Sequence, residues 1–198
     1  MNYLAHFYLS FEQEPLIVGN LLGDFVRGRL EHPRNQHYNA AVKQGILLHR
    51  HIDFFTDTHP TGQECRKVLP ARFSKFRGVV TDMYFDYFLA KYFRDYSTFP
   101  LHEFAVYVYG ILDKNRRVLP PDAASLAETM KKYDWLYNYQ FEERMIRSFV
   151  GMSQRFPFLK GIETAGEELF ANEQVYADYF RTFFPDLVHS CEDFLGSD

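Results

Sequence analysis

Apolar residues recur at helical spacing along most of the chain, and no stretch keeps the alternation of a half-buried strand. Proline, glycine and polar residues separate the periodic stretches, and Pro185 is expected to interrupt the last of them. The stretches with helical pattern are residues 15–30, 38–56, 79–93, 100–118, 122–132, 133–155 and 163–194. The pattern therefore predicts an all-α fold, a compact multi-helix single domain over residues 1–198.

Composition supports a well-packed helical core. Hydrophobic residues make up 46% of the chain and aromatic residues 18%, including 21 phenylalanines, which favours thick aromatic helix interfaces. The first ten residues, MNYLAHFYLS, are apolar apart from a few positions, so we expect them to be buried as a helix or a strand. Asp122 follows two prolines and can cap the helix after it.

The net charge of −4 disfavours non-specific binding to nucleic acid. The N-terminal residues lack the pattern of a signal peptide, and no apolar stretch approaches the ~20 residues that span a bilayer. Cys65 and Cys191 lie far apart in sequence and are expected to be free thiols. We expect a soluble, cytoplasmic protein that binds neither nucleic acid nor membrane.

The segment GILLHRHIDFFTD, residues 45–57, concentrates candidate metal ligands on one helix face. His49, Asp53 and Asp57 are four residues apart in turn, so their side chains share one stripe. Imidazole and carboxylate groups held one turn apart suit a divalent cation. The alternative is a surface helix with a simple hydrogen bond between His49 and Asp53.

Three further carboxylates lie among apolar residues, where an ionised group is costly unless it is paired. Asp24 could bind a cation or form a salt bridge with Arg27 or Arg29. Asp82 and Asp86 are one helical turn apart and repel each other, so a cation, a metal or a proton must compensate. The alternative is that Asp82 lies in a first helical turn and Asp86 is exposed, but the aromatic residues around Asp86 favour a functional role.

A run of basic residues follows the central segment: Lys67, Arg72, Lys75 and Arg77. Such a run is either a solvated face or a docking surface for an acidic partner. The residues alone leave both interpretations open.

Six motifs in order resemble the acyl carrier protein phosphodiesterase family, also called acyl carrier protein hydrolase. They are NYLAH at 2–6, GNLLGDFVRG at 19–28, GI-x-x-HR-x-ID-x-x-TD at 45–57, D-x-x-x-D at 82–86, WL-x-x-Y at 135–139 and GM-x-x-R at 151–155. The resemblance covers nearly the whole chain. It implies a helical fold distantly similar to that of the HD phosphohydrolases, although this chain lacks their adjacent His-Asp pair.

The resemblance also implies a manganese-dependent hydrolase, with Mg²⁺ or another divalent ion as the alternative. Its substrate would be the phosphodiester that joins 4′-phosphopantetheine to a serine of acyl carrier protein. Carried over to this sequence, the implied site residues are His6, Asp24, His49, Asp53, Asp82 and Asp86. Of these, Asp24, His49 and Asp53 are expected at the catalytic centre, and His6, Asp24, His49, Asp82 and Asp86 as metal ligands. Arg27, Arg50 and Arg155 are expected to contact the phosphoryl oxygens, with Arg50 also at the catalytic centre.

Two alternative functions stay open at this point. A related metal phosphohydrolase could act on a nucleotide or another small phosphoester, and a non-catalytic protein could bind acyl carrier protein without turnover. Acyl carrier protein is acidic, so its enzyme is expected to present a positive surface. The candidates are the run from Lys67 to Arg77 and, after it, Lys114, Arg116 and Arg117.

Overall fold

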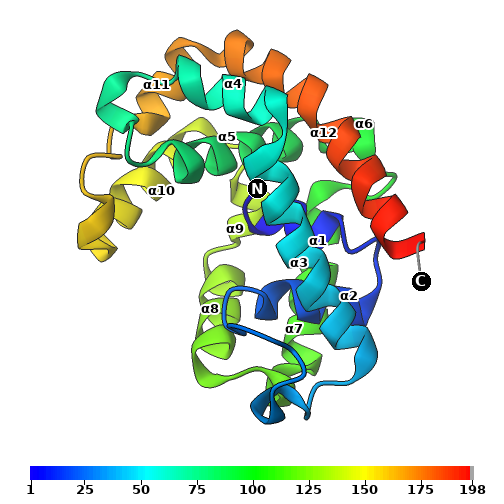
Figure 1. The fold of residues 1–198 in the computed structure, drawn as a ribbon. Helices are drawn as coiled ribbons and strands as arrows, with labels where there is room; N and C mark the ends of the chain where they lie inside the picture. Colours follow the sequence, from blue (N-terminus) through cyan, green and yellow to red (C-terminus); the bar gives the residue numbers. More distant parts are fainter. Residues whose placement is uncertain (197–198) are drawn as a thin grey trace.

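A computed structural model describes residues 1–196 of the chain, and within that range it contains twelve α-helices and no strand (Figure 1). This confirms the all-α prediction. The helices are α1 (Tyr3–Tyr8), α2 (Glu14–Leu22), α3 (Ala40–Thr58), α4 (Pro60–Val68), α5 (Arg77–Lys91), α6 (Phe93–Tyr96), α7 (Leu101–Lys114), α8 (Pro121–Lys132), α9 (Trp135–Asn138), α10 (Glu142–Arg155), α11 (Ala165–Ala171) and α12 (Glu173–Gly196).

Helix α3 connects the two halves of the molecule. Its first half packs on α2, which also contacts α7, and its second half meets α4 and α12 (Figure 1). The short helix α1 lies inside, against α2 and α5. The core between these helices is aromatic: Phe85, Phe88, Phe180 and Phe184 are fully buried and their rings contact one another. Large aromatic side chains fill the wide spaces between helices that cross at different angles.

Helices α2 and α3 approach each other closely through two glycines. A Cβ atom added to Gly19 would lie 2.6 Å from the Cα of Gly45, and one added to Gly45 would lie 2.8 Å from the Cα of Gly19. Only hydrogen side chains fit at this contact. It brings the end of α2 beside the histidine-bearing part of α3.

The predicted helix over residues 15–30 is wrong in its second half, because α2 ends at Leu22. The backbone N–H groups of Phe25 and Val26 both donate to the carbonyl of Leu22, which closes a turn. Arg50 of α3 then donates hydrogen bonds to the carbonyls of Val26 and Gly28, which lie beyond the end of α2. Tertiary contacts decide this helix end, and apolar spacing alone does not reveal them.

Two smaller predictions are also wrong. Pro185 does not interrupt the last helix: α12 runs through it, and the break lies earlier, at Asn172. The buried stripe that includes Phe183 and Leu187 holds α12 against the core and offsets the lost hydrogen bond. Asp122 lies within the first turn of α8, whose N-cap is Pro120, and it makes no capping hydrogen bond.

Other expectations agree with the structure. The N-terminal segment is buried and forms α1. Cys65 and Cys191 are both free and fully buried. Within the part of the chain that the structure describes, no helix is both long enough and apolar enough to cross a membrane.

Candidate metal centre

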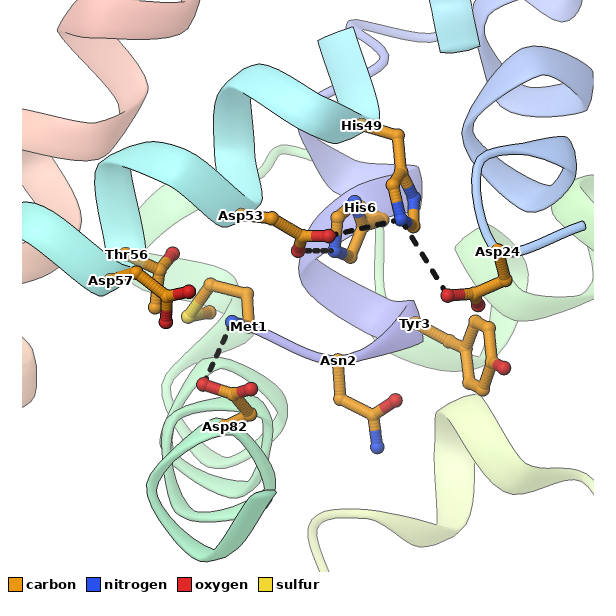
Figure 2. A pocket seen from close by; sticks show the side chains of 10 residues that line it. All are labelled: Met1, Asn2, Tyr3, His6, Asp24, His49, Asp53, Thr56, Asp57 and Asp82. Carbon is orange, nitrogen blue, oxygen red and sulfur yellow. Dashed lines mark ion pairs between the residues drawn. The ribbon is translucent and has the colours of Figure 1, made fainter. Parts of the chain in front are cut away.

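A polar cavity of about 320 Å³ opens where α1, α3, α5 and the turn after α2 meet (Figure 2). His6, His49 and four aspartates line it. The complete lining is Met1, Asn2, Tyr3, His6, Asp24, His49, Asp53, Thr56, Asp57 and Asp82.

Three of these side chains converge on one point. His6 Nε2 lies 3.3 Å from Asp53 Oδ1, and His49 Nε2 lies 3.1 Å from Asp53 Oδ2. The two imidazole rings stack with their centroids 4.2 Å apart. One ligand atom from each of the three residues lies within 4.8 Å of the others. His49 and Asp53 are one turn apart on α3, as the sequence predicted, and α1 supplies His6 from the opposite side.

A buried hydrogen-bond network fixes the orientation of His6. The Asn20 side-chain amide donates to Ser10 Oγ at 2.8 Å, and the Ser10 hydroxyl donates to the carbonyl of His6 at 3.0 Å. This arrangement turns Asn20 Oδ1 toward His6 Nδ1, 3.2 Å away. Because Asn20 Oδ1 can only accept, Nδ1 carries the proton and the Nε2 lone pair points at the cluster.

The protonation tendencies of the three groups differ. Burial lowers the pKa of His6, which therefore favours the neutral form that binds metals. Burial acts the same way on His49, but the hydrogen bond and charge of Asp53, with the charge of Asp24, outweigh it and raise its pKa. Partial burial would raise the pKa of Asp53, but the adjacent His49 and His6 side chains hold it well below its ordinary value. The carboxylate stays ionised between the two rings.

The turn after α2 brings Asp24 to the cluster. Asp24 Oδ1 lies 3.6 Å from His49 Nε2, on the side away from Asp53 (Figure 2). This approach requires a glycine at position 23, because a Cβ there would lie 2.1 Å from Cγ of His49. Burial and the neighbouring Asp24 carboxylate raise the pKa of Tyr3, so its hydroxyl stays protonated at the cavity wall.

The other end of the cavity holds Asp57 and Asp82. Arg66 Nη2 lies 2.7 Å from Asp57 Oδ1 and 3.8 Å from Asp82 Oδ1, and the amino group of Met1 lies 3.0 Å from Asp82 Oδ1. Burial raises the pKa of Asp82 despite these positive neighbours. Positive charge therefore compensates this pair of carboxylates, whereas the ion pairs of Asp24 and Asp53 within residues 1–196 are to histidines alone.

Asp86 has a structural position instead. It is fully buried, and its carboxylate accepts backbone N–H groups of Asn2, Leu4 and Ala5 at 3.1, 2.8 and 3.4 Å. These are the N–H groups that the first turn of α1 leaves without helical partners. Asp86 therefore anchors the helix that carries His6 and does not line the cavity. The alternative that Asp86 is exposed is also wrong.

None of the three arginines expected at the phosphoryl group lines the cavity. Arg50 is engaged with backbone carbonyls of the turn after α2. Arg27 is exposed, and its own carbonyl accepts from Arg34. Arg155 lies in a second cavity that adjoins the first.

The basic run is only partly free. Lys67 pairs with a glutamate one turn earlier on α4, and Arg72 pairs with Glu168 at 2.7 Å. Lys75 is exposed, and Arg77 is half-buried at the start of α5. Surface ion pairs of this kind contribute little to stability and leave part of the positive field intact.

The chemistry of the donor set fits a divalent cation. Two imidazole nitrogens and one ionised carboxylate point at a common centre, and Asp24 adds a carboxylate beside it. One imidazole is held by an outer hydrogen bond, the usual arrangement for a histidine ligand. The donors do not select one metal, because imidazole suits Zn²⁺ and Fe²⁺ and carboxylates suit Mn²⁺ and Mg²⁺.

The chain is similar to proteins of one known family. The family model described as acyl carrier protein phosphodiesterase matches residues 1–187. The chain belongs to this family. Proteins named acyl carrier protein phosphodiesterase from Salmonella paratyphi A and Photorhabdus laumondii are 30% and 28% identical to it, covering 95% and 98% of this chain and 96% of each relative. No solved structure matches the chain.

Within this acyl carrier protein phosphodiesterase fold, five of the six implied site residues line one cavity, and Asp86 does not. The sequence interpretation missed Asn20, Ser10 and Arg66. Asn20 follows the helical spacing of α2, so its polarity at a buried position was the available signal. Ser10 and Arg66 carried no comparable signal.

Proposed function

We propose that this protein is a metal-dependent hydrolase of the phosphodiester that links 4′-phosphopantetheine to a serine of acyl carrier protein. Its products would be the apo-carrier protein and 4′-phosphopantetheine. Membership of the acyl carrier protein phosphodiesterase family over residues 1–187 carries the proposal. The acidic, histidine-containing cavity supports the metal dependence.

The charge of the cavity is the physical argument for a cation. Its lining contains four aspartates and no lysine or arginine side chain. A phosphodiester is an anion and would be repelled there unless a cation stood between it and the carboxylates. A divalent ion held there would offset the charge of the phosphoryl oxygens and make a water molecule easier to deprotonate. Mn²⁺ is our first candidate, on the family resemblance.

The side chains have distinct roles in this proposal. His6, His49 and Asp53 hold the ion, and Asp24 serves as a further ligand or accepts the proton of the attacking water. Asp82 lies at the far end beside the Met1 amino group and Arg66, where it shapes the charge of the cavity. Tyr3 keeps its proton and can donate a hydrogen bond to a phosphoryl oxygen.

The decisive experiment is to incubate the metal-stripped protein with holo-acyl carrier protein, with and without Mn²⁺, and to weigh the carrier protein by mass spectrometry. We expect loss of the phosphopantetheine mass only with the metal. Asp24→Asn should lower kcat/KM by at least ~100-fold, and the exposed Asp95→Asn should leave it unchanged. Full activity of Asp24→Asn would show that Asp24 neither binds the ion nor accepts the proton of the attacking water.

The same assay separates the competing functions. Tight, metal-independent binding of the carrier protein without any change in mass would indicate a non-catalytic binding protein. Turnover of nucleotides or other small phosphoesters, with no turnover of holo-acyl carrier protein, would indicate a different phosphohydrolase.

A further inference from the structure

A second, larger cavity of about 900 Å³ lies between α8, α9 and α10. We call it the α8–α10 groove. Its size is in the range of pockets that enclose a small organic ligand, about 300–1,000 Å³. The site residues expected from the sequence, apart from Arg155, do not line it.

The α8–α10 groove is continuous with the metal centre. Asn2 and Tyr3 line both cavities. Phe25 and Met83, which line the groove, are the sequence neighbours of Asp24 and Asp82 in the metal centre. A substrate whose reacting group lies at His6 and His49 therefore has a direct path into the groove.

The lining of the groove differs in character from that of the metal centre. Leu126, Trp135, Met152 and Phe156 give it apolar walls. Hydroxyl and amide groups are interspersed, from Ser125, Thr129, Asn138 and Ser148. Such a surface suits a long uncharged molecule with both methyl and amide groups.

Charge excludes a second cation site here. Asp122 is the single acidic residue in the lining, against Arg144, Arg147 and Arg155. Within residues 1–196, Arg144 and Arg155 form no ion pair, and both are exposed on α10. Guanidinium groups at this rim can donate to the carbonyl oxygens of a ligand.

We propose that the α8–α10 groove binds the pantetheine arm of the substrate while its phosphodiester lies in the metal centre. The inference rests on the proposed function. The phosphorus carries two organic substituents, a protein serine and the arm. The arm is the slender one, and its two methyl groups, hydroxyl group and two amides match the lining. The folded carrier protein then stays outside, at the rim.

The chain carries its own reporter for this binding. Trp135, the single tryptophan of the sequence, lines the groove. We expect pantetheine, added to the metal-free protein, to change the tryptophan fluorescence in a saturable way, and inorganic phosphate to leave it unchanged. No turnover is needed, so this experiment can succeed even if the proposed phosphodiesterase activity fails.

Two glycines provide matched variants. Gly151 lies on α10 and lines the groove, and Gly110 lies on α7 away from it. A Cβ added at either position meets no atom within 4 Å, so both helices accept a side chain there. Gly151→Phe should weaken pantetheine binding at least tenfold because the ring fills the groove. Gly110→Phe and Gly151→Ala should stay within twofold of the wild type.

Three results would overturn the proposal. The first is that pantetheine causes no saturable change in the tryptophan fluorescence of the wild type. The second is that Gly151→Phe and the wild type bind pantetheine with equal affinity. The third is that apo-acyl carrier protein, which has no arm, causes the same fluorescence change as pantetheine. The last result would make a segment of the carrier protein the occupant. If the phosphodiesterase is active, Gly151→Phe should also raise KM for holo-acyl carrier protein at least tenfold, whereas Gly110→Phe should leave it within twofold.

Discussion

At the scale of single residues, the candidate metal centre depends on groups that do not line its cavity. His6 can present Nε2 to a cation because Asn20 holds its other nitrogen. The Asn20 amide is itself oriented by Ser10. A sequence pattern can reveal ligand types on a helix face, but not which buried amide sets the tautomer of a histidine on another helix.

Asn20→Leu removes the partner of His6 Nδ1 and keeps the number and branching of the side-chain heavy atoms. We expect Mn²⁺ affinity, measured by isothermal titration calorimetry, to fall by about 10- to 100-fold, as for other outer hydrogen-bond partners of metal ligands. Stability should fall by about 1–3 kcal/mol, since a buried donor loses its partner. Unchanged Mn²⁺ affinity would show that Asn20 does not orient a ligand.

A substitution at Gly23 tests the position of His49 in the same site. Gly23→Ala places a methyl group where the ring of His49 now lies, 2.1 Å from Cγ. We expect both Mn²⁺ affinity and melting temperature to fall, because either the ring or the turn must move. Gly151→Ala is the matched control; it meets no atom within 4 Å and should stabilise α10 by up to about 1 kcal/mol. A Gly23→Ala protein with wild-type Mn²⁺ binding would contradict this account.

At the scale of elements, apolar spacing located most helices, and it failed where tertiary contacts end or extend one. The turn after α2 is held by Arg50, a residue 24 positions away from its partner Val26. Helix α12 continues through Pro185 because its apolar face is buried. Apolar spacing also shows which residues of α5 are buried, but it does not show that Asp86 contacts the N-terminal end of α1.

Asp86 couples α5 to α1 in a pH-dependent way. Burial raises the pKa of its carboxyl from 3.8 to about 7. Between these values the folded protein keeps a proton that the unfolded chain has lost. The stabilisation from this proton is therefore complete below about pH 4 and is lost as the pH rises through about 7.

Comparison with Asp86→Asn isolates this effect, because the amide cannot titrate. We expect the stability advantage of the wild type over Asp86→Asn to shrink by about 3 kcal/mol between about pH 5 and pH 8. Thermal unfolding of both proteins across this range measures it, with Asp95→Asn as an exposed control. A difference that stays constant or grows with pH would show that Asp86 is ionised throughout.

At the scale of the whole molecule, charge is distributed unevenly, although the net charge is −4. The candidate metal centre is acidic, and two basic regions lie outside its lining: the run around Arg72 and Lys75, and the arginines of α10 in the adjoining groove. Sequence position alone identified the first region. The second became visible only when α10 was placed beside the metal centre.

A negative carrier protein should be steered by whichever basic region faces its approach. If the first region acts, Arg72→Glu with Lys75→Glu should raise KM for holo-acyl carrier protein several-fold at low salt, and less at physiological salt, where the Debye length is about 8 Å. Hydrolysis of a small phosphodiester should not change. Lys114→Glu with Arg117→Glu, measured in the same way, tests the other candidate docking surface. Equal losses on both substrates would indicate a folding defect instead of a lost docking surface.

The two buried cysteines make the protein well suited to site-specific labelling. Both side chains are fully enclosed, and burial raises the pKa of each thiol to about 12, so the reactive thiolate is scarce at neutral pH. A cysteine introduced at an exposed position would therefore react with maleimide dyes without prior removal of the native thiols. A fluorophore placed this way on α10 and another on the carrier protein would report the bound orientation through energy transfer.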